Sequence, residues 1–243
     1  MTLGVPNKPT TTTKERPAPS FPLPNVLITG ESSTGKTYSF RNMDWSKTAF
    51  IDTEVKGFPF PLSEQFKKNY YPVETYLEML PTIAEVRARD DIRYVVIDSF
   101  TDFNTKAMVG ERKANAAAKD GFAAYKANSM WIFDFLAACK SKKQITIVTA
   151  LPEILTGVTE DGKSQSLARR AKVQGREMEG AVEPAFVYAF CTKFVPGKPQ
   201  AEAYKFVTQS DGVNLAKSPA GAFSTVLIDN DMAAVIKQIE ARI

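Results

Sequence analysis

The chain has 243 residues, of which 44% are hydrophobic and 24% charged, with a formal net charge of +4. These values are typical of a globular domain, and the small basic excess permits binding to nucleic acid without requiring it. The sequence has no histidine, which excludes Ser-His-Asp triads and histidine-containing metal sites. No apolar run approaches the roughly eighteen residues of a membrane span, so we expect a protein without a membrane anchor.

Two features of composition suggest how the chain is organised. Residues 1–24 contain six prolines among Thr, Ser, Lys and Glu, a composition that buries too little apolar surface to offset the entropy of ordering. We therefore expect a flexible Pro-rich arm over 1–24 and one α/β domain over 25–243. Cys139 and Cys191 have no C-x-x-C spacing and are expected to be small buried hydrophobes in a cytoplasmic protein.

The strongest motif in the chain is a phosphate-binding loop. Residues 30–37, Gly30-Glu31-Ser32-Ser33-Thr34-Gly35-Lys36-Thr37, match the P-loop pattern G-x-x-x-x-G-K-[ST] at every fixed position. The apolar run over residues 25–29 before it predicts a buried strand, and residues 38–41 after it can continue a helix. The motif therefore stands in the strand, loop and helix setting that a P-loop requires.

The residue types of this loop specify a ligand. Gly30 and Gly35 allow the backbone to turn tightly, so that successive N–H groups can bind phosphate oxygens. Lys36 is expected to reach the β- and γ-phosphates of ATP, and Thr37 to offer its hydroxyl to Mg²⁺. The helix that follows should add the positive end of its dipole.

Acidic residues follow the next two predicted strands. Residues 47–52 read as a buried strand that leads into Asp52-Thr53-Glu54, and residues 93–97 read as another that ends at Asp98. Ligands in parallel sheets lie at the carboxyl ends of strands, so Glu54 is our candidate for activating water, with a loop-capping acid as the alternative. Asp98 fits a Walker B acid that holds Mg²⁺ opposite Thr37, and Ser99 is a secondary candidate.

A fourth buried strand is predicted over residues 144–150, and Thr149 near its end is placed to sense the γ-phosphate. The region 151–180 follows, with a hairpin or loop tip at residues 160–163. After that tip come the four basic residues Arg169, Arg170, Lys172 and Arg176. They could grip a nucleic-acid backbone or provide an arginine finger to a neighbouring subunit, or they could line an ordinary solvated loop.

The remaining segments are predicted to complete the domain. Residues 55–71 form a loop with short helical pieces whose aromatics either stack on a base or, as we favour, join the core. Helical spacing covers 73–89 and 100–142, strands over 185–195 and 203–207 extend the sheet as antiparallel partners, and 229–243 form a helix capped by Asp229 or Asn230. The loop aromatics are Phe58, Phe60, Tyr70 and Tyr71.

The order of these motifs resembles the RecA-like ATPase core over residues 25–240. Phe50-Ile51-Asp52-Thr53-Glu54 is similar to the RecA segment whose final glutamate activates water, and this likeness favours Glu54. Within that class the chain looks most like phage-encoded AAA-domain ATPases that act in single-strand annealing or recombination. The resemblance implies a homo-oligomer that binds ATP and Mg²⁺, acts on single-stranded DNA and works with a single-strand-binding protein. Thr149 departs from the RecA pattern, which has glutamine there.

Two other functions remain open from the sequence. A P-loop kinase would transfer phosphate to a small acceptor and would need an arginine-bearing lid, for which 169–176 is the available segment. A nucleotide-gated scaffold with negligible turnover would use Glu54 only as a structural acid.

Overall fold

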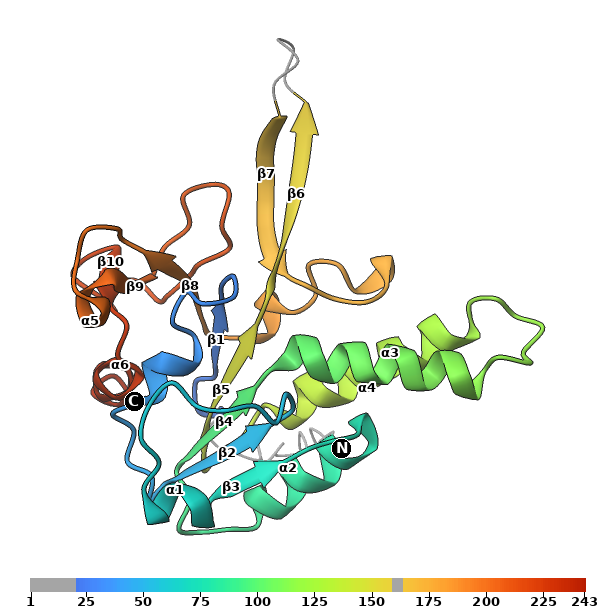
Figure 1. The fold of residues 1–243 in the computed structure, drawn as a ribbon, viewed down its shortest axis with the longest axis horizontal. Helices are drawn as coiled ribbons and strands as arrows, with labels where there is room; N and C mark the ends of the chain where they lie inside the picture. The colour runs from blue at the N-terminus through green and yellow to red at the C-terminus, as the bar shows by residue number, and fades with distance from the viewer. Residues whose placement is uncertain (1–20, 159–163) are drawn as a thin grey trace, which may run out of the picture.

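The computed structural model describes residues 21–158 and 164–243, which form a twisted eight-stranded sheet with helices on both faces (Figure 1). Most of the expected Pro-rich arm and the expected hairpin tip at 160–163 lie outside these residues. Across the sheet the strands are β10 (Leu227–Asp229), β9 (Tyr204–Val207), β8 (Tyr188–Phe194), β1 (Val26–Thr29), β5 (Ile145–Ala150), β4 (Tyr94–Asp98), β2 (Thr48–Asp52) and β3 (Tyr70–Pro72).

The centre of the sheet is parallel and fully buried, as its continuous apolar runs predict. β1, β2, β4 and β5 match the four predicted strands to within a residue or two, and β5 separates the P-loop strand β1 from the Walker B strand β4. β9 pairs antiparallel with β8, as expected, and with β10, a short strand that the sequence did not predict. The expected fold class, a mainly parallel sheet with flanking helices and antiparallel C-terminal strands, is confirmed.

The direction of β8 differs from the expectation, because β8 pairs parallel to β1 and only its pairing with β9 is antiparallel. Asn25, just before β1, donates to the Ala185 carbonyl at 2.9 Å and accepts from Val187 N–H at 3.0 Å. These bonds make the chain enter β8 beside the start of β1, so that the two strands run the same way.

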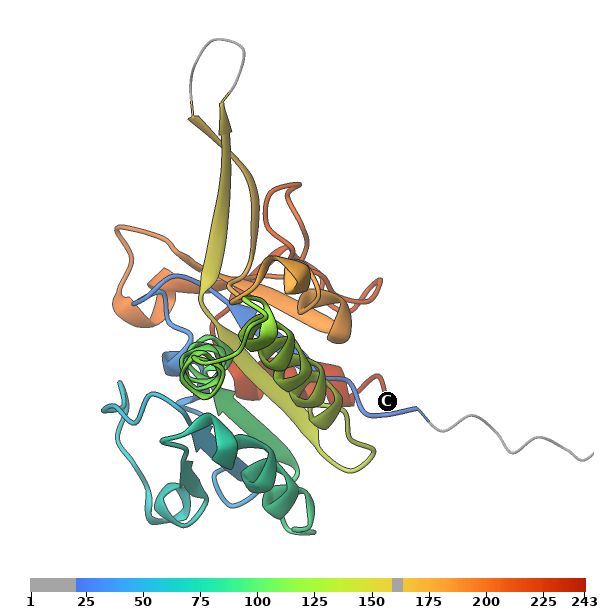
Figure 2. The same ribbon diagram turned by 90° about the vertical axis from the view of Figure 1, so that its right-hand side faces the viewer.

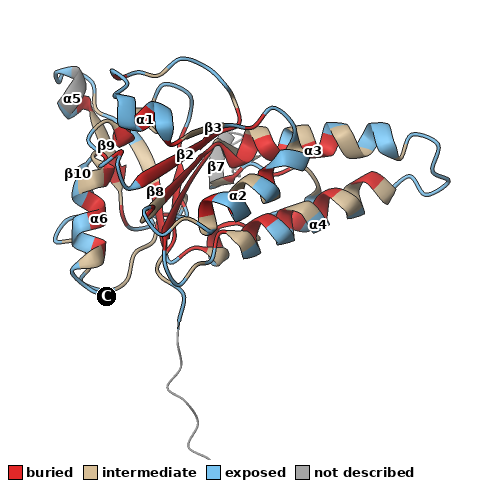
Figure 3. Ribbon diagram, turned by 90° about the horizontal axis from the view of Figure 1, so that it is seen from below, coloured by how far each residue is buried: buried red, intermediate tan, exposed pale blue. Residues whose placement is uncertain are grey.

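Helices α2 (Met79–Arg87), α3 (Phe100–Ala114) and α4 (Ala123–Ala138) cover one face of the sheet, while α6 (Met232–Glu240) covers the other (Figures 2 and 3). Successive strand residues point to opposite faces of the sheet. Leu27 therefore packs in the core beneath α2, α3 and α4, whereas Val26 and Ile28 pack in the core beneath α6. The helical region expected over 100–142 forms two separate helices, α3 and α4.

The closing helix is confirmed, but its cap is not the one expected. Asp231, rather than Asp229 or Asn230, accepts from the N–H groups of Ala233 and Ala234. A short aspartate that accepts from the second and third N–H groups of a helix is a standard N-cap. The predicted loop over 55–71 contains α1 (Glu64–Lys68), and the described residues include one further short α-helix, α5 (Gln200–Ala203).

The basic region after β5 forms a two-stranded antiparallel ribbon of β6 (Pro152–Val158) and β7 (Ser164–Ala171). The ribbon projects from the body of the domain (Figure 1). β6 begins directly after β5, so the ribbon leaves the sheet at the carboxyl ends of its parallel strands. Within the described ranges, no helix combines the length and apolar character needed to cross a membrane.

Candidate nucleotide-binding site

The P-loop joins β1 to a single 3₁₀ turn, Thr37–Phe40, and its backbone curls around the ammonium group of Lys36. Gly35 has φ +94° and Ser33 φ +62°, and such left-handed residues orient neighbouring N–H groups toward one point. Lys36 Nζ donates to the carbonyls of Gly30 and Glu31 at 2.7 and 2.8 Å. Burial lowers the pKa of Lys36, against the opposing effect of Asp98 and Glu54.

The helix expected after the loop is reduced to this one turn, which corrects the prediction of a helix dipole behind the phosphates. The following residues include Asn42, Asp44 and Ser46, and the Asp44 carboxylate accepts from Ser46 N–H and Oγ at 3.1 and 2.6 Å. Such side chain to backbone bonds favour turns over helix. A turn of four residues sums few peptide dipoles, so the loop N–H groups and Lys36 carry most of the positive potential.

Both loop glycines are packed against the C-terminal strands. A Cβ on Gly30 would overlap the Thr192 hydroxyl of β8, and a Cβ on Gly35 would lie 2.8 Å from the Tyr204 ring of β9. The Thr34 and Thr192 hydroxyls are 2.5 Å apart. β8 and β9 therefore fix the shape of the loop from outside.

Asp98 at the end of β4 meets the P-loop, as predicted. Thr37 Oγ1 donates to Asp98 Oδ2 at 2.6 Å, and the Thr149 hydroxyl donates to Asp98 Oδ1. Asp98 is 5% exposed, and this burial raises its pKa against the opposing hydrogen bonds from Thr149 and Thr37. Thr149 is thus engaged with Asp98, and its proposed contact with a γ-phosphate remains a prediction.

The end of β2 brings Glu54 to the same place. Glu54 Oε1 accepts from Ser99 Oγ at 3.1 Å, and Oε2 pairs with the Lys56 ammonium. Asp52 does not face the cavity but holds the turn, since its Oδ1 accepts from Glu54 and Val55 N–H, each at 3.0 Å. In the segment Asp52-Thr53-Glu54, Asp52 is therefore a structural acid, and Glu54 is the acid that lines the site.

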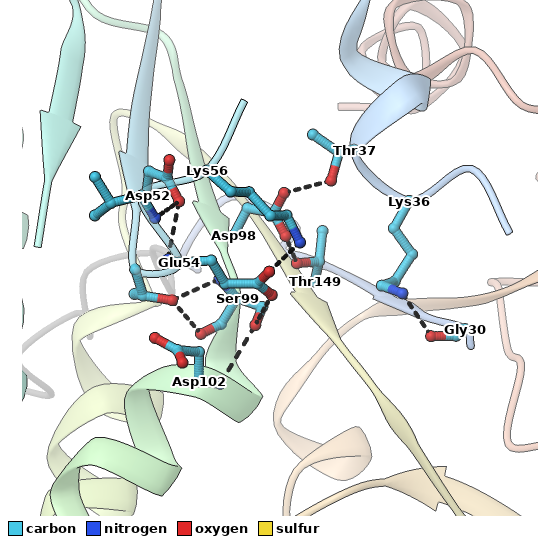
Figure 4. A network of polar contacts seen from close by, with 12 residues as sticks. Gly30, Lys36, Thr37, Asp52, Glu54, Lys56, Asp98, Ser99, Asp102 and Thr149 are labelled. Atoms are coloured by element: carbon cyan, nitrogen blue, oxygen red, sulfur yellow. Dashed lines mark hydrogen bonds and ion pairs between the residues drawn. The ribbon is translucent and has the colours of Figure 1, made fainter. Parts of the chain in front are cut away.

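These groups surround one cavity of ≈ 490 Å³ between the P-loop, the segment after β2 and the end of β4 (Figure 4). Lys36, Thr37, Glu54 and Asp98 all line it. So does Phe58, one of the loop aromatics named above, together with residues that the sequence did not single out: Tyr38, Lys56, Gly57, Pro59, Leu151 and Tyr204. Tyr38 adjoins the motif and could have been found, whereas no local signal brings Tyr204 beside the P-loop.

The loop aromatics belong mainly to the core, as we favoured. Phe60 is buried, and Phe58 packs edge-on against Phe50 with ring centroids 5.2 Å apart. Tyr70 donates to Asp52 Oδ2 at 2.9 Å. Phe58 is the member of this group that also reaches the cavity wall.

The four basic residues of the ribbon region do not line this cavity in the described structure. Arg169, Lys172 and Arg176 are exposed. Arg170 is held by two carboxylates, with Nη2 at 3.1 Å from Glu153 and 2.8 Å from Glu179. Arg170 therefore stabilises the ribbon base, which makes it less available to DNA than its neighbours.

Comparison with known proteins assigns the family. A family model described as an AAA domain matches residues 24–182. The chain belongs to this AAA-domain family. The match takes in the P-loop, Glu54, Asp98 and the base of the ribbon, so these parts of the site described above lie within the matched domain.

A crystal structure of the RadB recombinase matches at 15% sequence identity and a TM-score of 0.43, covering 77% of this chain and 89% of that chain. No curated protein matches the chain in sequence.

Proposed function

We propose that the AAA domain hydrolyses ATP with Mg²⁺ and acts as a homo-oligomer on single-stranded DNA. The observation that carries the ATPase proposal is the contact of Thr37 with Asp98 at 2.6 Å, beside Lys36 and Glu54 on one cavity. This arrangement combines a phosphate-binding loop, a pair of oxygen ligands and a carboxylate, which are the parts that phosphoryl transfer requires.

The residues fit Mg²⁺ and a triphosphate. A hydroxyl and a carboxylate are the hard oxygen donors that Mg²⁺ accepts together with phosphate oxygens, and Thr37 and Asp98 would hold the ion. The Lys36 ammonium has three donors, of which the carbonyls of Gly30 and Glu31 take two, leaving one for a phosphate. The bound ion would neutralise charge that develops on the phosphates.

Glu54 would orient and deprotonate the attacking water. Its carboxylate lies at the end of β2 beside Asp98, and Ser99 holds one of its oxygens at 3.1 Å. The other oxygen faces the cavity with Lys56. Tyr38 and Tyr204 also line the cavity, with ring centroids 5.6 Å apart at 55°, and together would form one wall against the base or ribose of the nucleotide.

The ribbon supports the DNA part of the proposal. The ribbon leaves the sheet at the carboxyl ends of the parallel strands, where the P-loop also lies. Leu151, at the base of the ribbon, lines the nucleotide cavity. Exposed Arg169 and Lys172 lie on or just after β7, where they could pair with phosphates of a DNA backbone. Assembly with further copies, a single-strand-binding protein as partner and a cytoplasmic role in phage recombination or replication complete the proposal.

The experiment measures ATP turnover with and without single-stranded DNA for the wild type and Glu54→Gln. We expect DNA-stimulated turnover that the variant loses while it still binds ATP, and the exposed Glu64→Gln should behave as the wild type. Turnover that needs a small acceptor would instead indicate a kinase. ATP binding without turnover under either condition would indicate a nucleotide-gated scaffold, and either result would overturn the proposal.

A further inference from the structure

The segment after β2 turns at Val55, beside the nucleotide cavity. Val55 has φ +47°, a left-handed conformation that β-branched residues rarely adopt. The two hydrogen bonds from Glu54 and Val55 N–H to Asp52 Oδ1, each 3.0 Å, hold it there. Glu54 and Lys56, on either side of Val55, both line the cavity.

The two sides of the Glu54 carboxylate have different partners. Oε1 accepts from Ser99 Oγ at 3.1 Å, and Ser99 is 1% exposed and fixed at the start of α3. Oε2 pairs with the Lys56 ammonium, whose side chain is 59% exposed against 27% for Glu54. Ser99 is thus the rigid partner, while Lys56 can leave without disturbing the core.

Lys56 and Lys36 approach the cavity from different elements. The Lys36 amine is turned toward Gly30 within the P-loop, whereas the Lys56 amine lies between Glu54 and Asp98 (Figure 4). A triphosphate held by the P-loop and by Thr37 and Asp98 would place its terminal phosphate on the Glu54 side, where the attacking water must stand. Lys56 is the cation on that side.

We propose that Lys56 is a second lysine for the terminal phosphate of ATP, held by Glu54 until the nucleotide arrives. This inference rests on the ATPase proposal above. On binding, the ammonium moves from Glu54 Oε2 to an oxygen of the terminal phosphate, which carries more negative charge than a carboxylate. The freed Oε2 then accepts from the attacking water. The move of Lys56 to the terminal phosphate thereby frees Glu54 to act as the base, and the ammonium neutralises charge in the transition state.

The decisive measurement is nucleotide affinity, which does not depend on turnover. Dissociation constants for a non-hydrolysable ATP analogue and for ADP, both with Mg²⁺, are compared for the wild type, Lys56→Met and Lys56→Arg. We expect Lys56→Met to weaken the analogue about tenfold, the value of one charge-assisted hydrogen bond, and ADP less than about twofold. Lys56→Arg should keep most of the preference for the ATP analogue over ADP. Lys47→Met, an exposed lysine paired with Asp44, is the control.

A double-mutant cycle tests the exchange between Glu54 and phosphate. Glu54→Gln releases Lys56, so it should tighten binding of the ATP analogue more in the wild-type background than in Lys56→Met. Equal losses for the analogue and ADP, no loss in Lys56→Met, or additive effects in the cycle would overturn the inference. A wild type that binds neither nucleotide would instead overturn the ATPase proposal, so the two failures are distinct.

Discussion

Thr37 Oγ1 lies 2.6 Å from Asp98 Oδ2, although the strands that precede these residues are not neighbours in the sheet. β5 runs between β1 and β4, and its Thr149 donates to the other Asp98 oxygen. Two strand ends and the first residue of the 3₁₀ turn therefore converge on one carboxylate. Because that carboxylate is buried and bonded from both sides, small changes there should be visible in stability and in nucleotide binding.

Lys36→Met should abolish most nucleotide binding. The variant removes a half-buried ammonium that the loop carbonyls of Gly30 and Glu31 hold in place. The loss of charge-assisted hydrogen bonds to phosphate should weaken ATP and ADP alike by about 10–100-fold. Calorimetric titration with both nucleotides checks this, with the exposed Lys67→Met as control. Unchanged affinity for both nucleotides would show that the P-loop does not bind them.

Asp98 should make the stability of the metal-free protein depend on pH. Burial raises the pKa of Asp98 in the folded chain above its ordinary value, so folding favours the protonated form. This contribution is fully present below the ordinary pKa and is lost as pH rises through the raised one. The free energy of unfolding should therefore fall over that window in the wild type, and the fall should be smaller in Asp98→Asn.

Urea denaturation in a chelator at a series of pH values measures this dependence. The exposed Asp90→Asn, which loses only a surface pair with Lys143, should keep the wild-type profile. Asp98→Asn should also lose the response of nucleotide affinity to Mg²⁺. Identical pH profiles for the wild type and Asp98→Asn would contradict the prediction.

Much of the fold could be predicted because its central strands have strong local signals. Residues 26–29, 48–52, 94–98 and 145–150 are short apolar runs, and such runs are buried in parallel sheets whatever surrounds them. The direction of β8 could not be predicted in this way, because it depends on Asn25, which lies more than a hundred residues earlier. Strand direction is a long-range property that composition does not encode.

The residues of the candidate site also differ in whether the sequence alone predicts them. Lys36, Thr37 and Asp98 follow from motifs whose chemistry needs those residue types, and the structure brings them together. Lys56 could not be selected, because it lies between β2 and α1 in a loop without a motif, and that loop turns at Val55 with a left-handed backbone. A β-branched residue in that conformation runs against local propensity, and departures of this kind gather at functional sites.

Gly35→Ala should destabilise the domain and weaken nucleotide binding together. The φ of +94° is unfavourable for alanine, and the new Cβ would lie 2.8 Å from the Tyr204 ring. Crowding of this kind costs about 1–3 kcal/mol, which chemical denaturation can measure directly. Gly121→Ala is the matched control, since a Cβ there meets no atom within 4 Å. Equal stability of the two variants would show that β9 does not constrain the loop.

The ribbon arginines should separate into DNA contacts and structural pairs. Arg169→Ala and Lys172→Ala remove exposed charges, so each should weaken single-stranded DNA binding without changing stability. Each lost phosphate contact should lower the slope of log affinity against log salt by about 0.7. Arg170→Ala breaks pairs with Glu153 and Glu179, so it should lower the free energy of unfolding.

Fluorescence anisotropy with a labelled oligonucleotide at several salt concentrations measures the slopes, and denaturation measures stability. Lys143→Ala is the control, because Lys143 is exposed and lies just before β5, at the opposite end of that strand from the ribbon. A salt slope that falls equally in Lys143→Ala and Arg169→Ala would mean that DNA binds through diffuse charge. The ribbon would then have no special part in binding, because any exposed cation would serve as well.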